Sequence, residues 1–434
     1  MTFRTLVALF AFCSICVPQL LVEIPELSER VKTPDLFAVI AVPLALLLYA
    51  SRCSPGKLQF TTFLTFAFAA VVIFVRILLD SNRELYLENL PHLARLFSIL
   101  APLFLVVAMP SDRKTLYRFT IGFGVLATGA SIAIALLYHF GSTAFDAHQT
   151  FARQGGDLTH RLGGLPGESG AFAFNATVGI QLLLVGLAMA KLRKQYYLAL
   201  WILFPLFIAL VYHESLARIS LLNSLVFFSV SLVGVNHSRF SSRFLLLMIV
   251  LVGSTTFLLL SAAGNPLADV EVERVNFSGS LDGLSSGRLS HWKVASEVWL
   301  DSPGYVLFGM GHRAPDFILD HPVENMVLFH LVNYGIIGTV LFGCLYASLA
   351  WPILRAGIRG DFGGGAFSAM LLSILVQWQV NDVNLYYQTF PCLLFFSAWY
   401  RSVLENEKKD IEEKRVVAHP VAEPPEQRQL STSA

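Results

Sequence analysis

Charged residues are scarce in this chain: they make up 14% of its 434 residues, while hydrophobic residues make up 55%. A soluble domain of this length has about a quarter charged residues, so the deficit excludes an ordinary water-soluble fold and favours a lipid bilayer as the solvent. The formal net charge is only +1. That leaves no excess of positive charge for a phosphate backbone, so nucleic acid is not an expected partner.

Cysteine is scarce as well, with five in the chain. Cys13 and Cys16 form a Cys-x-x-Cys inside the first apolar run, without a nearby His or further Cys. Packing within a helix is therefore favoured over a metal or redox role. The same run lacks a small-x-small cleavage site, and Pro18 to Ile24 continue it. It is predicted to be a first spanning helix rather than a signal peptide.

Apolar runs long enough to span a bilayer recur along the chain. At roughly 20 residues per span, they predict an all-α polytopic membrane protein with about twelve transmembrane helices. Residues 1–404 are expected to form one transmembrane domain, and the charged, then Pro-rich tail 405–434 is expected to be disordered. The runs centre on 5–22, 35–50, 59–79, 91–109, 119–139, 170–190, 196–212, 219–235, 243–262, 325–349, 364–380 and 385–402.

Every second loop between these runs is basic, and the loops between the basic ones are acidic or mixed. By the positive-inside rule the basic loops and both termini face the cytoplasm, in a bacterial inner membrane. Two long extracytoplasmic segments remain, 141–169 and a periplasmic loop at 263–324, and loops of this length are usually functional. The basic loops carry Arg52 and Lys57; Arg113, Lys114 and Arg118; Lys191, Arg193 and Lys194; Arg239 and Arg243; and Arg355 and Arg359.

The second long segment contains one amphipathic stretch, from Arg288 to Leu300. Trp292 and other apolar residues alternate there with polar ones such as His291. This pattern predicts a helix lying along the membrane surface.

Three arginines are expected at the extracytoplasmic side: Arg161 before the sixth run, Arg218 at the start of the eighth, and Arg288 in the long loop. A guanidinium group matches phosphate oxygens and stays charged, so together they predict a cradle for a phosphorylated ligand. The alternative is that each arginine reaches lipid head groups or pairs with a nearby carboxylate. Glu214 is close in sequence to Arg218, and Glu168 is close to Arg161.

A further pattern lies where the long loop enters the tenth run: Glu324-Asn325, nine residues, then Gly335-Ile-Ile-Gly338. Two glycines three residues apart let a neighbouring helix approach closely. A carboxylate and an amide at the outer end of the helix can face a bound sugar.

With these parts together, the chain resembles the bacterial O-antigen ligase and polysaccharide polymerase superfamily, over about residues 60–400. That family has many membrane helices and a large late periplasmic loop. The loop has an Arg shortly before a Trp, a Pro-containing turn with Gly-x-Gly, and His-Asn-x9-Gly-x-x-Gly entering a helix. The corresponding parts here are Arg161-Leu-Gly-Gly164, Arg218, Gly287-Arg288-Leu-Ser-His-Trp292, Ser302-Pro303, Gly309-Met-Gly311 and Glu324-Asn325 with Gly335 and Gly338.

The sequence departs from the family at one position, where Glu324 stands in place of the His proposed as the base. A carboxylate serves as a general base if burial raises its pKa, and His321 lies three residues earlier. The alternative is that Glu324 only favours the start of a helix through the helix dipole. With Glu324 in place of His, the motif resembles that of the polymerase branch, which is less strict.

The resemblance implies a GT-C-like fold and an inverting polymerase that joins glycan repeat units carried on undecaprenyl diphosphate. Arg161, Arg218 and Arg288 would neutralise the diphosphate, and Glu324 or His321 would take the proton from the acceptor hydroxyl. The chain has no Asp-x-Asp motif, so no metal or cofactor is expected. A flippase and a chain-length regulator are the expected protein partners. The residues expected to bind substrate are Arg161, Arg218, His291, Asn325 and Glu168.

Three alternatives stay open. A ligase would transfer the glycan to lipid A core instead. A transporter or flippase would need charged groups near mid-bilayer, for which Arg76 is the candidate, and no matched pair of broken helices is evident. Gly167-Glu168-Ser169-Gly170 matches an intramembrane serine protease motif, with His330 as the partner, but such enzymes have about half as many helices.

Overall fold

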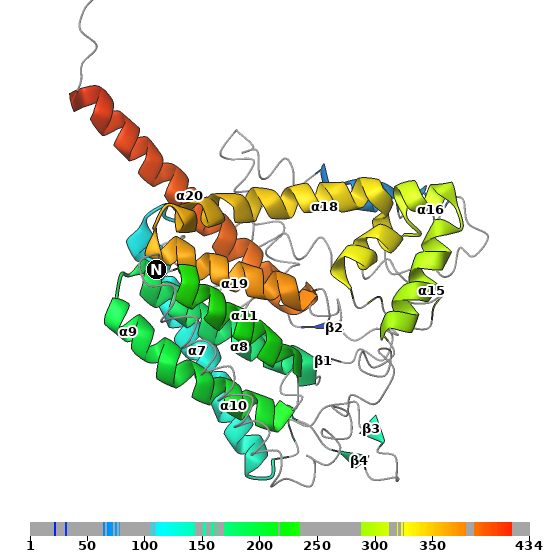
Figure 1. Ribbon diagram of the computed structural model, residues 1–434, viewed down its shortest axis with the longest axis horizontal. Coiled ribbons are helices and arrows are strands. Elements are labelled where there is room, and N and C mark those ends of the chain that lie inside the picture. Colours follow the sequence, from blue (N-terminus) through cyan, green and yellow to red (C-terminus); the bar gives the residue numbers. More distant parts are fainter. Residues whose placement is uncertain are drawn as a thin grey trace, which may run out of the picture.

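The computed structural model describes residues 109–142, 169–215, 218–234, 288–311, 325–378 and 386–418, with shorter pieces elsewhere. These parts are almost entirely helical (Figure 1). Four helices within them are long and apolar enough to cross a membrane: Arg113–His139, Phe172–Met189, Arg193–Ser215 and Met326–Ile358. The chain is therefore a helical membrane protein, as its composition predicts.

One group of helices packs side by side in the bundle of Figure 1. Small residues set the closest contact, between α7 and α8: a Cβ on Gly124 would lie 2.4 Å from the Leu183 nitrogen, and one on Gly186 would lie 2.7 Å from Ile121. Lipid supplies no hydrophobic driving force between membrane helices, so their association depends on van der Waals packing of this kind. The group comprises α7 (Arg113–His139), α8 (Ser169–Met189), α10 (Phe204–Ser215), α11 (Arg218–Gly234) and α19 (Phe362–Trp378).

The third spanning segment contains a local change of helix type. It comprises α9 (Arg193–Leu198), the π-helix η3 (Ala199–Leu203) and α10. Pro205 lacks an N–H and its ring would clash with the Trp201 carbonyl in a regular helix. The wider π turn relieves that clash, and the Phe204 N–H bonds back to Ala199.

A second group of helices packs beside this bundle. The predicted surface helix is confirmed as a helix, α15, with bounds Arg288–Leu300. It is followed by α16 (Pro303–Phe308), and both pack against the long helix α18 (Met326–Ile358), as Figure 1 shows. The Trp299 indole donates to the Tyr305 carbonyl at 3.0 Å and holds α15 to α16.

The last helix, α20 (Tyr386–Ala418), extends well beyond the bundle (Figure 1). Residues 405–418, which composition predicts to be disordered, are therefore helical. Charged side chains there form helix-spaced ion pairs, such as Lys408 with Glu412, and Glu407 is anchored to Arg113. These contacts supply the partners that composition alone does not reveal. Residues 419–434 lie outside the described part.

The described helices match the predicted runs from 119–139 to 219–235 and from 325–349 to 385–402. The runs 35–50, 91–109 and 243–262 lie outside the described residues, apart from single positions, so the count of twelve stays a prediction. The run 59–79 is described in part, and those residues are helical. Residues 5–20 lie outside the described part. The helix predicted over 5–22 is wrong for its last two residues, because Leu21–Val22 form a strand, β1, that pairs with β2 (Val31–Lys32).

Predicted basic loops meet at one end of the bundle, called here the Arg113 end. A Cβ on Gly363 would lie 2.9 Å from Met189, and one on Gly357 would lie 3.0 Å from Gly365, so the α8–α9 and α18–α19 connections both lie there. The opposite end, where α7 and α10 finish and α11 begins, is called the His139 end. A second short strand pair, β3 (Phe151–Ala152) with β4 (Leu158–Thr159), lies in the chain that follows α7.

Candidate functional site

The two glycine pairs singled out in the sequence meet in space. Gly309, which ends α16, has φ 78°, and Gly335, inside α18, has φ 66° and ψ −171°. Side chains rarely tolerate either conformation. A Cβ on Gly309 would lie 2.3 Å from the Asn333 carbonyl carbon, and one on Gly335 would lie 2.3 Å from the Leu307 carbonyl carbon. Both positions therefore require glycine for conformation and for space.

Gly335 breaks α18 into a short helix, 326–334, and a longer one. Such a break leaves carbonyl groups at the end of the short helix without their usual partners four residues on. The Met310 N–H donates to the Val332 carbonyl at 2.8 Å, and the Gly311 N–H donates to the Asn333 carbonyl at 3.0 Å. The Gly-x-Gly turn therefore caps the broken helix; this contact, from Gly309 to Gly311 against 332–335, is called the glycine clasp.

Gly338 completes the pattern. A Cβ there would lie 2.3 Å from the Tyr334 Cβ and 3.0 Å from a ring carbon of Phe68. The sequence predicted that a neighbouring helix approaches these glycines. At Gly335 the close neighbour is the end of α16 and the turn after it, and at Gly338 it is Tyr334 of the same helix together with Phe68.

Asn325 is the N-cap of α18. Its side-chain oxygen accepts a hydrogen bond from the Leu328 N–H at 3.0 Å. This satisfies one amide of the first turn, a role that the sequence pattern alone did not assign. Glu324 comes just before the cap, where the helix dipole favours negative charge, but Glu324 and His321 lie outside the described residues.

His330 links the two parts of the broken helix. Its side chain is buried; Nδ1 donates to the Met326 carbonyl at 2.6 Å, and Nε2 lies 3.2 Å from the Tyr346 hydroxyl. Both ring nitrogens therefore have partners within α18, and Phe342 packs against the ring at 4.6 Å between centroids. A role as the base of a serine protease gains no support from this geometry.

For the predicted arginine cradle, the structure describes the backbone of Arg218 and Arg288 but not their side chains. Arg218 is the first residue of α11, and Arg288 is the first residue of α15. Arg161 lies outside the described residues, but the N–H of the next residue, Leu162, donates to the Glu214 carbonyl at 3.0 Å. That hydrogen bond brings the chain at 161–162 against the end of α10, a few residues before Arg218. Glu168, which immediately precedes α8, is also outside the described part.

On α15, His291 is half-buried and has interactions of its own. The indole nitrogen of Trp292 is buried and has no hydrogen-bond partner among the described residues.

Sequence patterns did not predict a cluster at the His139 end. Nδ1 of His139 and Nδ1 of His213 each lie 3.0 Å from the same oxygen, Oε1, of Glu214. Glu214, the alternative partner considered for Arg218, is thus in contact with two histidines. The sequence signal was the adjacent pair His213-Glu214, but nothing near that pair pointed to His139 at the end of the run 119–139. Among the described residues, no group of three His, Cys, Asp or Glu side chains is placed to hold a metal ion.

A second polar cluster lies inside the bundle. The Gln181 amide donates to the Asn223 oxygen at 2.5 Å, and the Asn223 amide donates to the Gln377 oxygen, which links α8, α11 and α19. All three side chains are fully buried. The Gln181 oxygen and the Gln377 nitrogen have no hydrogen-bond partner among the described residues. Buried polar groups inside a membrane bundle are costly, and such groups are often functional.

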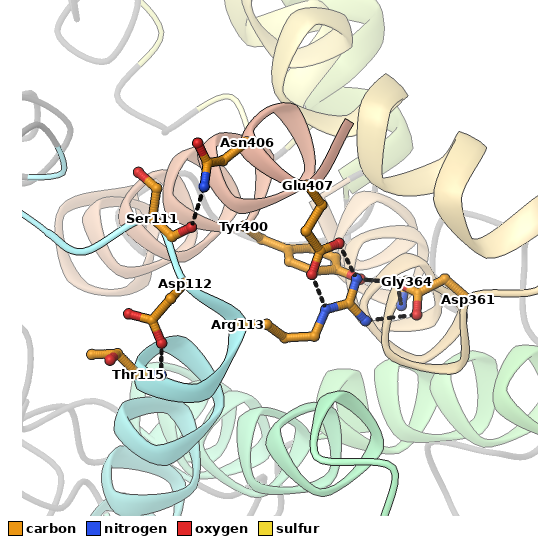
Figure 2. A network of polar contacts seen from close by, with 9 residues as sticks. All are labelled: Ser111, Asp112, Arg113, Thr115, Asp361, Gly364, Tyr400, Asn406 and Glu407. Carbon is orange, nitrogen blue, oxygen red and sulfur yellow. Dashed lines mark hydrogen bonds and ion pairs between the residues drawn. The ribbon is translucent and has the colours of Figure 1, made fainter. Parts of the chain in front are cut away.

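The Arg113 end is held by a charged network (Figure 2). Arg113 Nε donates to Glu407 at 2.8 Å and Nη1 donates to Asp361 at 2.8 Å, so one guanidinium joins α7, α20 and the start of α19. The Tyr400 hydroxyl donates to Asp361, which also caps α19 through the Gly364 N–H at 3.2 Å. Burial disfavours the charged form, but the hydrogen bonds from Arg113 and Tyr400 outweigh it and hold the pKa of the Asp361 carboxyl below its ordinary value.

Comparison with protein-family models and with curated proteins finds no match for this chain.

Proposed function

We propose that the chain is a polysaccharide polymerase of the bacterial inner membrane, an inverting glycosyltransferase acting at the periplasmic face. Its substrates are oligosaccharide repeat units carried on undecaprenyl diphosphate, and both termini of the chain face the cytoplasm. The His139 end then faces the periplasm, and the Arg113 end, with its basic loops, faces the cytoplasm.

The glycine clasp is the observation that carries this proposal. The Gly-x-Gly and the Gly-x-x-Gly belong to the pattern of the ligase and polymerase superfamily. Here Gly309 lies against the backbone of Asn333 and Tyr334, and Gly335 lies against the backbone of Leu307 and Phe308. The two parts of the pattern thus meet in one contact in which both positions require glycine. The hydrogen bond between Leu162 and Glu214 adds support, because it brings together the chain segments of Arg161 and Arg218.

In the proposed reaction Arg161, Arg218 and Arg288 neutralise the diphosphate as the bond to the sugar breaks. Asn325 orients a sugar hydroxyl from the start of α18. The acceptor hydroxyl must also lose a proton, a role that the sequence pattern predicts for Glu324 or His321. The transfer uses no metal, since the arginines supply the positive charge.

Reconstitution tests this function. Purified protein in proteoliposomes receives lipid-linked repeat units, with and without EDTA, and the product length is measured on gels. Longer chains are expected in both conditions. Arg218→Ala and Arg288→Ala are expected to abolish lengthening. Lys293→Ala is the matched control, because Lys293 is an exposed cation on α15 whose side chain is 76% exposed. Lengthening that is intact in both arginine variants contradicts the arginine cradle.

Two other functions differ from this one by product. A ligase transfers the glycan to lipid A core, so supplying that acceptor in place of a second lipid-linked glycan separates the two. A transporter of lipid-linked sugars is favoured by the break in α18 and by the buried amides, since discontinuous helices bind substrates in transporters. Substrate that crosses vesicles without new glycosidic bonds would identify the transporter.

A further inference from the structure

The cluster at the His139 end joins a buried carboxylate to two exposed histidines. The Glu214 side chain is 7% exposed, whereas those of His139 and His213 are 56% and 51% exposed. An ionised carboxylate only accepts hydrogen bonds, so each Nδ1 carries a hydrogen. In the neutral ring, Nε2 then has a lone pair that can accept a proton from another molecule.

Both rings lie at the ends of helices. His139 lies in the last turn of α7 and His213 lies in the last turn of α10. The Glu214 side chain lies between the two rings, 3.0 Å from Nδ1 of each. A carboxylate that fixes one ring nitrogen and supports charge on the other is the arrangement by which an aspartate serves a catalytic histidine.

The position of the cluster connects it to the proposed donor site. The Glu214 carbonyl accepts a hydrogen bond from the N–H of Leu162, the residue after Arg161. Ser215 ends α10, and Arg218 begins α11 three residues later. The chain segments that carry two of the three proposed diphosphate arginines therefore converge on the histidine pair.

We propose that His139 or His213, positioned by Glu214, is the proton acceptor of the glycosyl transfer, in place of Glu324 and His321; this rests on the proposed function. Nε2 takes the proton of the acceptor hydroxyl as that oxygen forms a bond to the anomeric carbon. The bond from the anomeric carbon to the diphosphate oxygen breaks, and its electron pair leaves with the diphosphate. The imidazolium then releases its proton to water.

The test uses the double variant His139→Asn/His213→Asn. The asparagine amide nitrogen takes the place of Nδ1 and still donates to Glu214, but nothing replaces Nε2. Chain lengthening is expected to fall about 100-fold or more, the usual contribution of general-base catalysis, while thermal stability stays at the wild-type value. Glu214→Gln keeps an accepting oxygen and removes the charge, so it is expected to lower kcat with little change in KM. Lys293→Ala serves again as the unaffected control.

The outcomes separate this proposal from the function on which it rests. Wild-type protein that makes no longer chains overturns both. Lengthening that persists in the double variant, with a loss in Glu324→Gln or His321→Asn, overturns the histidine base alone. Acylation by diethyl pyrocarbonate, read by mass spectrometry, gives a second measurement that does not need activity. His139 or His213 is expected to react with the reagent, and the buried His330 is expected not to react. If neither His139 nor His213 reacts, the proposal is also overturned.

Discussion

Replacing Gly309 by alanine tests the glycine clasp. Alanine at φ 78° costs about 1–3 kcal/mol in backbone strain. Its Cβ would also lie 2.3 Å from the Asn333 carbonyl carbon, which must move. That movement removes the two hydrogen bonds from Met310 and Gly311, worth about 0.5–1.5 kcal/mol each. The expected loss in free energy of unfolding is therefore about 2–6 kcal/mol.

The assay is thermal or denaturant unfolding of the purified protein in detergent. Gly343→Ala is the matched control: Gly343 lies on α18, and a Cβ there meets nothing within 4 Å. Alanine is the better helix former, so this control is expected to be neutral or to stabilise by up to about 1 kcal/mol. If Gly309→Ala unfolded at the same temperature or denaturant concentration as Gly343→Ala, the glycine clasp would not be what holds the broken helix together.

Three further predictions concern the other polar clusters. Arg113→Ala removes a guanidinium that bridges two carboxylates and is expected to destabilise by about 2–3 kcal/mol; Lys114→Ala, an exposed cation one residue away, should be near neutral in the same unfolding assay. Asp361 has a lowered folded pKa, so its contribution is complete above its ordinary value of 3.8 and is lost as pH falls further, through the folded pKa. Unfolding measured against pH should show that acid-side loss in wild type and less of it in Asp361→Asn. Asn223→Leu removes the hydrogen bonds of Asn223 to Gln181 and Gln377 and should destabilise by about 1–3 kcal/mol, whereas replacing all three amides by apolar residues should restore most of the loss.

The spanning helices could be predicted because their signal is local. A run of about 20 apolar residues can satisfy its backbone in a bilayer only as a helix. In the stretch Arg288–Leu300 the alternation of apolar and polar residues likewise predicted a helix, and α15 has those bounds. The tail could not be predicted by composition, because Glu407 is held by Arg113, 294 residues away in the chain.

The site was predictable in part for the same reason. Gly335 and Gly338 were visible as a pattern, but the break at Gly335 depends on its contact with the turn at Gly309, which spacing alone does not reveal. The pairing of His139 with Glu214 joins residues 75 apart, and no local pattern marks it. Contacts of this kind depend on how helices pack, so they became visible only with the structure.

The proposed lengthening of glycans on a lipid diphosphate can be measured with purified components. Purified wild-type protein in proteoliposomes is given a single lipid-linked repeat unit in the presence of EDTA, and the lipid-linked products are sized. A ladder of longer chains is expected with the wild-type protein and with Lys293→Ala, and none with Arg218→Ala. Starting material that stays at one repeat unit with the wild-type protein would contradict the proposed function.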